Sequence, residues 1–74
     1  MDPMEHRLDV RGLRCPVPYV RAKALVPGLE AGDVLVVLAT DPEAPVDLGA
    51  LAADERLAFG CERDGAGWRL TLRR

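Results

Sequence analysis

Apolar and polar residues alternate along residues 8–11, 57–62 and 68–73, as they do in strands that bury one face. A fourth strand is predicted at residues 34–39, because this run is continuously apolar and rich in β-branched side chains. Such a run is typical of a central strand that is covered on both faces, or nearly so. The pattern therefore predicts four strands, with residues 34–39 inside the sheet.

The phase of the last two strands also predicts which side chains face the core. Asp64 to Gly67 should form the hairpin turn between these strands. Cys61 falls on the inward phase, so we expect a buried thiol without a chemical role. The side chains predicted to face inward are Leu57, Phe59, Cys61, Trp68, Leu70 and Leu72.

Two helices are predicted between the strands. The first should run from Pro16 to about Val26, where Pro27 and Gly28 end or kink it. The second should lie within Ala44 to Glu55. The apolar stripes expected to face the sheet are Val17, Val20, Ala24 and Leu25 in the first helix and Leu48, Leu51 and Ala52 in the second.

The element order β-α-β-α-β-β predicts an α/β (α+β) two-layer sandwich, in which two helices cover one face of a four-stranded mixed sheet. The first two strands should be parallel, because a helix connects them. The opposite face should be charged. Residues 7–74 should form a single domain, preceded by a disordered segment over residues 1–6.

Candidate chemistry is concentrated in Gly12-Leu13-Arg14-Cys15-Pro16-Val17-Pro18, where a strand should end and a helix begin. Pro16 suits the first helical position and Pro18 is tolerated in the first turn, which places Cys15 at the N-cap. Free N–H groups, the helix dipole and Arg14 should together lower the pKa of Cys15 from about 8.5 to about 7. Cys15 is therefore a candidate nucleophile; a cysteine that merely caps the helix is the alternative.

Asp41 is the second candidate site residue. In sheets with parallel strands, ligand chemistry tends to lie beyond the carboxyl ends of the strands, where Cys15 and the Asp41-Pro42 loop should meet. Asp41 would border the site there, or serve only as a turn or cap residue. His6 lies in the segment expected to be disordered, so no Cys-His pair is predicted.

Composition narrows the class of protein. The chain has 74 residues, 49% of them hydrophobic and 30% charged, with a formal net charge of -2, which favours a soluble globular domain without a polyanionic partner. No apolar run is long enough for membrane insertion, and the N-terminus is too polar for a signal peptide, so we expect a cytoplasmic protein. Two cysteines without C-x-x-C or metal-ligand spacing predict neither metal nor cofactor.

Leu8-Asp9 and the Gly12-to-Pro18 segment, with its C-P-x-P element, resemble the signature of the small TusA/SirA-like sulfur-carrier proteins. The resemblance continues through Gly32-Asp33, Asp41-Pro42, Asp47 and the closing hairpin. It implies that Cys15 accepts a sulfane sulfur as a persulfide and relays it, with Arg14, Pro16, Pro18 and Asp41 supporting the site or binding partners. The chain departs from the family at Pro27-Gly28, which interrupts a helix that members often continue with lysines.

The resemblance also implies partners: a cysteine desulfurase or rhodanese-like donor, and a downstream acceptor protein. The pathway stays open among tRNA thiolation, molybdenum-cofactor maturation, sulfur oxidation and thiosulfate uptake. The competing function is a non-catalytic regulatory or transporter-accessory module in which Cys15 is a structural cap. Direct RNA binding is not expected, because the open sheet face lacks aromatic side chains for base stacking. We expect a monomer.

Overall fold

The sheet and helices follow the predicted order in a computed structural model that describes residues 4–74. The elements are β1 (Glu5–Asp9), α1 (Val17–Leu25), a short 3-10 helix η1 (Val26–Gly28), β2 (Val34–Ala39), α2 (Ala44–Asp54), β3 (Ala58–Asp64) and β4 (Gly67–Arg73). Since β1 begins at Glu5, the prediction of a disordered segment is wrong for Glu5 and His6. Residues 1–3 lie outside the described residues.

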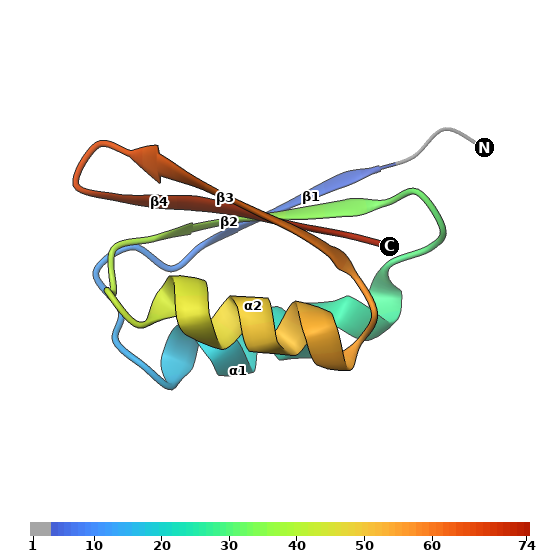
Figure 1. Ribbon diagram of the computed structural model, residues 1–74, viewed down its shortest axis with the longest axis horizontal. Coiled ribbons are helices and arrows are strands. Elements are labelled where there is room, and N and C mark those ends of the chain that lie inside the picture. The colour runs from blue at the N-terminus through green and yellow to red at the C-terminus, as the bar shows by residue number, and fades with distance from the viewer. Residues whose placement is uncertain (1–3) are drawn as a thin grey trace.

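The four strands form one mixed sheet in the order β1-β2-β4-β3. β1 pairs with β2 in parallel, whereas β4 pairs antiparallel with both β2 and β3. Both helices lie on the same face of this sheet (Figure 1). The two-layer architecture is therefore confirmed. β2 is central as predicted, and its residues 35, 36, 37 and 39 are buried although helices cover only one of its faces.

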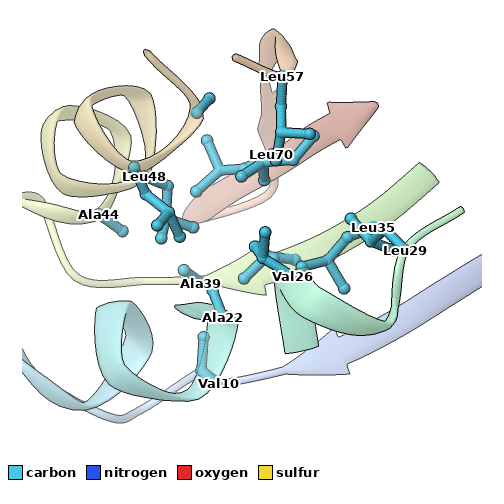
Figure 2. Close-up of a cluster of buried hydrophobic side chains, with 14 residues drawn as sticks. Val10, Ala22, Val26, Leu29, Leu35, Ala39, Ala44, Leu48, Leu57 and Leu70 are labelled. Carbon is cyan, nitrogen blue, oxygen red and sulfur yellow. The ribbon is translucent and has the colours of Figure 1, made fainter. Parts of the chain in front are cut away.

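The core lies between the helices and the sheet (Figure 2). α2 buries Leu48, Leu51 and Ala52, as the sequence predicts. For α1 the predicted stripe is wrong. Its inward residues are Pro18 and Ala22, followed by Val26 of η1, whereas the predicted residues Val17, Val20, Ala24 and Leu25 are exposed. Apolar residues occur on both sides of this helix, so the helical spacing alone fits either phase.

The expected burial of Cys61 is also wrong. Cys61 pairs with Leu70, so it lies on the helix-facing side of the sheet as its phase predicts, but its thiol is exposed. β3 is an edge strand, and burial there depends on how far α2 reaches over it. The ring of Phe59 lies against Gly49 of α2 yet remains 38% exposed. Cys61, two residues further along β3, is left outside this cover.

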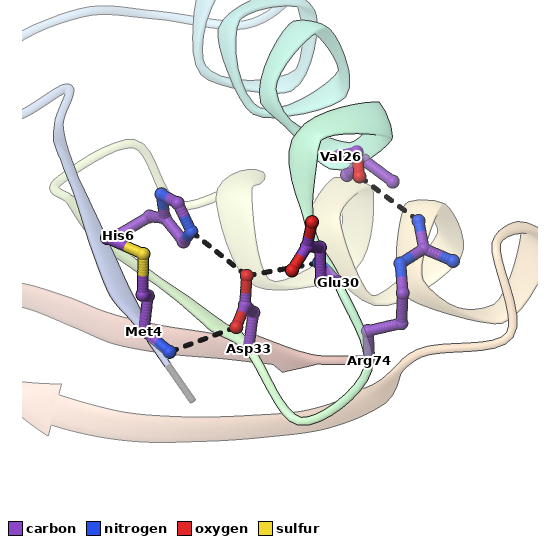
Figure 3. Close-up of polar contacts among 6 residues, drawn as sticks. All are labelled: Met4, His6, Val26, Glu30, Asp33 and Arg74. Atoms are coloured by element: carbon purple, nitrogen blue, oxygen red, sulfur yellow. Dashed lines mark hydrogen bonds and ion pairs between the residues drawn. The ribbon is translucent and has the colours of Figure 1, made fainter. Parts of the chain in front are cut away.

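A buried carboxylate fastens the start of β1 to the loop before β2 (Figure 3). Asp33 accepts hydrogen bonds from the backbone N–H groups of Met4 at 2.9 Å and Glu30 at 3.0 Å, and the Nε2 atom of His6 lies 3.3 Å from it. These backbone hydrogen bonds, together with His6, lower the pKa of Asp33. The N-terminal strand is thereby held at its first residues.

Asp33→Asn should lower the thermal unfolding midpoint by several degrees, because a neutral amide accepts these hydrogen bonds less strongly than a carboxylate. Since the folded-state pKa of Asp33 lies below its unfolded value, this stabilisation is present above about pH 4 and is lost as the pH falls further. Thermal melts followed by circular dichroism at about pH 5 and about pH 2.5 would check this. An equal gap between wild type and variant at both pH values would contradict it.

Candidate functional site

Cys15 lies in the loop between β1 and α1, directly before the first helical turn. After β1 the chain turns at Gly12, whose φ of 82° favours glycine and whose N–H donates to Thr40 Oγ1 at 2.8 Å. The N-cap is Pro16 rather than Cys15, and no side chain caps the helix. The prediction of Cys15 at the N-cap and Pro16 at the first helical position is therefore wrong by one residue, because the helix begins one residue later. Pro18 lies in the first turn and is buried, so it packs into the core rather than being merely tolerated.

Asp41 connects this loop to the beginning of α2. Its carboxylate accepts hydrogen bonds from the backbone N–H groups of Cys15 and, at 3.0 Å, Glu43. Its backbone carbonyl accepts one from Ala44 at 3.0 Å. Asp41 is only 9% exposed. Asp41 thus forms the turn before α2 and also fixes the backbone of Cys15.

Asp47, in the first turn of α2, contacts the thiol itself. Cys15 Sγ donates a hydrogen bond to Asp47 Oδ2 at 3.0 Å. This bond, with partial desolvation and the negative charges of Asp47, Asp41 and Glu43, raises the pKa of Cys15 to about 11. The predicted lowering to about 7 is therefore wrong. The helix start and Arg14 lie next to Cys15 in the sequence, whereas the opposing carboxylates come from a segment about thirty residues further along the chain.

Sequence reasoning did not assign Asp47 a role. A carboxylate in the first turn of a helix is already explained by its interaction with the helix dipole. The only signal that singled it out was the family resemblance, which extends over this position.

An open cleft of about 480 Å³ borders the cysteine loop. Residues of the loop before α1 and of the Asp41-Pro42 loop both line this cleft. The two loops therefore meet beyond the ends of β1 and β2, as predicted. Arg14 lines this cleft and is exposed, and it forms no ion pair within residues 4–74. The lining residues are Gly12, Leu13, Arg14, Thr40, Asp41 and Pro42.

Three exposed valines lie within the first four residues of α1 or α2, after Cys15 or just before Asp47 in the sequence. Val17 and Val20 of α1 are 37% and 57% exposed, and Val46, which precedes Asp47, is 69% exposed. We call these three residues the valine rim. Large apolar side chains on a surface are common singly, but three that lie near Cys15 and Asp47 in the sequence suit contact with another protein.

The remaining candidate groups are not part of this site. His6 is held by Asp33 at the start of β1, whereas Cys15 follows the other end of that strand. Cys61 lies on β3, at the opposite edge of the sheet from β1. Within residues 4–74, no three histidine, cysteine, aspartate or glutamate side chains are grouped as metal ligands would be. No helix in the same range has the length and apolar character needed to cross a membrane.

Comparisons with known proteins match the chain over almost its whole length. The family profile described as "Sulfurtransferase TusA" matches residues 6–74. A putative sulfur carrier protein of Neisseria meningitidis serogroup A is 56% identical over 60 residues, covering 78% of this chain and 81% of that protein. The sulfur carrier protein TusA of Allochromatium vinosum is 42% identical over 52 residues, covering 70% and 68%. The crystal structure of a SirA-like protein from Desulfitobacterium hafniense superposes with a TM-score of 0.74 at 30% identity, covering 93% of each chain.

Proposed function

Because the chain belongs to the TusA sulfurtransferase family, we propose that it is a sulfur carrier whose Cys15 accepts a sulfane sulfur as a persulfide and passes it to an acceptor protein. The observation that carries the proposal is the placement of Cys15. Its thiol is exposed and its backbone is fixed by Asp41, while the preceding residue, Arg14, lines an open cleft. A carrier needs a thiol that two different partners can reach in turn.

The transfer chemistry requires little from the carrier itself. The Cys15 thiolate attacks the outer sulfur of the donor persulfide, and the inner sulfur of the donor leaves as a thiolate. An acceptor thiolate later attacks the outer sulfur on Cys15 in the same way. A second cysteine beside Cys15 would expel that sulfur and form a disulfide. Cys61 lies on the edge strand β3 and so does not interfere with the relay.

The competing module, in which Cys15 serves only as a helix cap, is not favoured by the geometry. A capping sulfur would accept hydrogen bonds from the free N–H groups of α1. Cys15 Sγ instead donates to Asp47 Oδ2, and α1 has no side-chain cap. The thiol is therefore not used to stabilise the helix.

The partners we propose are proteins: a cysteine desulfurase or rhodanese-like donor, and an acceptor in one of the four pathways considered above. The valine rim supports contact with a protein surface. Direct RNA contact is disfavoured, because two arginines of the open sheet face and one in the turn after β1 are paired with carboxylates, in Arg7–Glu5, Arg69–Glu62 and Arg11–Asp9. The proposed compartment is the cytoplasm, where cellular reductants keep such thiols free.

Incubation with a low-molecular-weight persulfide should add the mass of one sulfur atom to the protein. Intact mass spectrometry measures the gain, and tryptic digestion should place it in peptide 15–21, which contains Cys15, and not in peptide 57–63, which contains Cys61. Cys61→Ser is the matched control and should gain the same mass. Absence of any gain, or a gain confined to peptide 57–63, would refute the proposal.

A further inference from the structure

On the premise that Cys15 is the persulfide carrier, we propose that Asp47 holds Cys15 in a protonated resting state, and that a donor which presents a cationic group to Asp47 transfers sulfur to Cys15 faster than one that does not. Asp47 then regulates the same site through direct contact with the reacting sulfur, and the donor is recognised by its positive charge.

The geometry makes Asp47 the group that controls the thiol proton. Sγ donates to Oδ2 at 3.0 Å, a contact that a thiolate cannot make with an ionised carboxylate. Within residues 4–74 this carboxylate accepts a hydrogen bond from no other group and has no cationic partner. Asp47 is thus free to accept an ion pair from outside. Asp41 is not, because it is buried and its two oxygens are bound to backbone N–H groups.

Among residues 4–74, the charged groups that shift the pKa of the thiol are all negative. They belong to Asp41, Glu43 and Asp47, from the loop before α2 and from its first turn. Arg14, adjacent to Cys15 in the chain, is not paired with any of them. On α1, Lys23 lies over the ring of Tyr19 at 5.7 Å from its centroid. A positive charge that would release the proton must therefore come from a partner.

The size of the pKa shift sets how much the release of the proton would speed sulfur transfer. With the pKa of Cys15 at about 11, only about one molecule in ten thousand carries a thiolate at pH 7. At the unperturbed value of 9.0 the fraction would be about a hundred times larger. A thiol of lower pKa is also a weaker nucleophile, by about eightfold over this range, so the net gain in transfer rate is about tenfold.

The transfer step then balances without an oxidant or reductant. The cationic group pairs with Asp47, and the Cys15 proton passes to solvent. Cys15 Sγ forms a bond to the outer sulfur of the donor R–S–SH, while the bond between the two donor sulfurs breaks and its electron pair stays on the inner sulfur. That thiolate takes up a proton from solvent. The products are Cys15–S–SH and R–SH, with the same number of sulfur atoms and protons as the reactants.

Two small persulfides that differ in charge test the proposal. Cysteamine persulfide carries an ammonium group, and 3-mercaptopropionate persulfide carries a carboxylate. The wild-type protein should gain sulfur severalfold faster from the first. In Asp47→Asn this preference should shrink towards unity, because loading from 3-mercaptopropionate persulfide should become faster by up to about tenfold while loading from cysteamine persulfide changes less. Asp54→Asn, with the same charge change at the last residue of α2, should behave as wild type.

The rate of alkylation by neutral iodoacetamide, measured against pH, gives a readout that a merely structural residue would not change. Its midpoint should move from about pH 11 in wild type towards pH 9.0 in Asp47→Asn, with circular dichroism confirming the fold. An unmoved midpoint, or equal loading of wild type by both donors, would overturn the role of Asp47. No sulfur gain from either donor in any of the proteins would instead overturn the proposed function, and with it the effect of a cationic donor on Asp47.

Discussion

Cys15→Ser should reduce sulfur loading to the background of a protein-free control while leaving the fold intact. A serine hydroxyl does not ionise in the range where thiols do, and it cannot form the persulfide. Cys15 is exposed, and a hydroxyl can still donate to Asp47 Oδ2. The free energy of unfolding should therefore change by no more than about 0.5 kcal/mol. Sulfide released by dithiothreitol from the loaded, desalted protein measures the carried sulfur.

The control for this experiment is the other cysteine. Cys61→Ser also replaces an exposed thiol by a hydroxyl, but on the edge strand β3. It should release as much sulfide as wild type. Retention of more than a small fraction of the sulfur by Cys15→Ser would mean that another group carries it. A loss in both variants would point to the fold rather than to the chemistry.

Asp41→Ala should cause the largest loss of stability among substitutions at the site. It removes a buried carboxylate that accepts from two backbone N–H groups, those of Cys15 and Glu43. Hydrogen bonds to charged groups contribute about 1.5–3 kcal/mol each, and solvent can reach part of the opened loop, so we expect a loss of about 2–4 kcal/mol. In a domain of this size that lowers the melting temperature by about 10–20 °C. Urea unfolding followed by circular dichroism would measure it.

Asp41→Asn keeps the shape of the side chain while removing its charge and one of its two acceptor oxygens. The amide keeps one oxygen acceptor but replaces the other with a donor, so the loss should be smaller than in Asp41→Ala. Sulfur loading by Asp41→Ala, measured below its melting temperature, should not fall, because the substitution removes one of the negative charges that raise the pKa of Cys15. A change of less than about 1 kcal/mol in Asp41→Ala would show that this loop is held by other contacts.

The sheet could be predicted because each strand carries its own local pattern. Residues 34–39 are continuously apolar and form the central β2, while the alternation in residues 68–73 places Leu70 and Leu72 in the core. Alternation does not reveal how much of a face is covered. Cys61 has the inward phase and is nevertheless exposed, because it lies on an edge strand.

The orientation of α1 could not be predicted from spacing. Val17, Val20 and Ala24 form one apolar stripe, and Pro18 and Ala22, continued by Val26, form another. The sheet and α2 bury the second set. The side chains left outside include two members of the valine rim, so the residues on which the wrong prediction rested belong to the proposed contact surface.

The site was predictable only as far as topology determines it. Parallel β1 and β2 bring their carboxyl ends together, which places Cys15 beside Asp41. The protonation state of the thiol depends on Asp47, which lies 32 positions further along the chain. Local sequence around Cys15 indicates a rigid, positively charged helix start and so predicts a thiolate. Only the three-dimensional arrangement shows the carboxylate that opposes it.

The two outer strands also bear on how the protein behaves at high concentration. Unpaired backbone groups at a sheet edge can recruit a strand from a second chain, and natural proteins discourage this with short or charged edges. β1 is five residues long, with charged side chains at Glu5, Arg7 and Asp9, and β3 ends in Glu62-Arg63-Asp64. We therefore expect neither edge to seed the stacking of strands into aggregates, so that a carrier accumulated in excess over its partners stays dispersed.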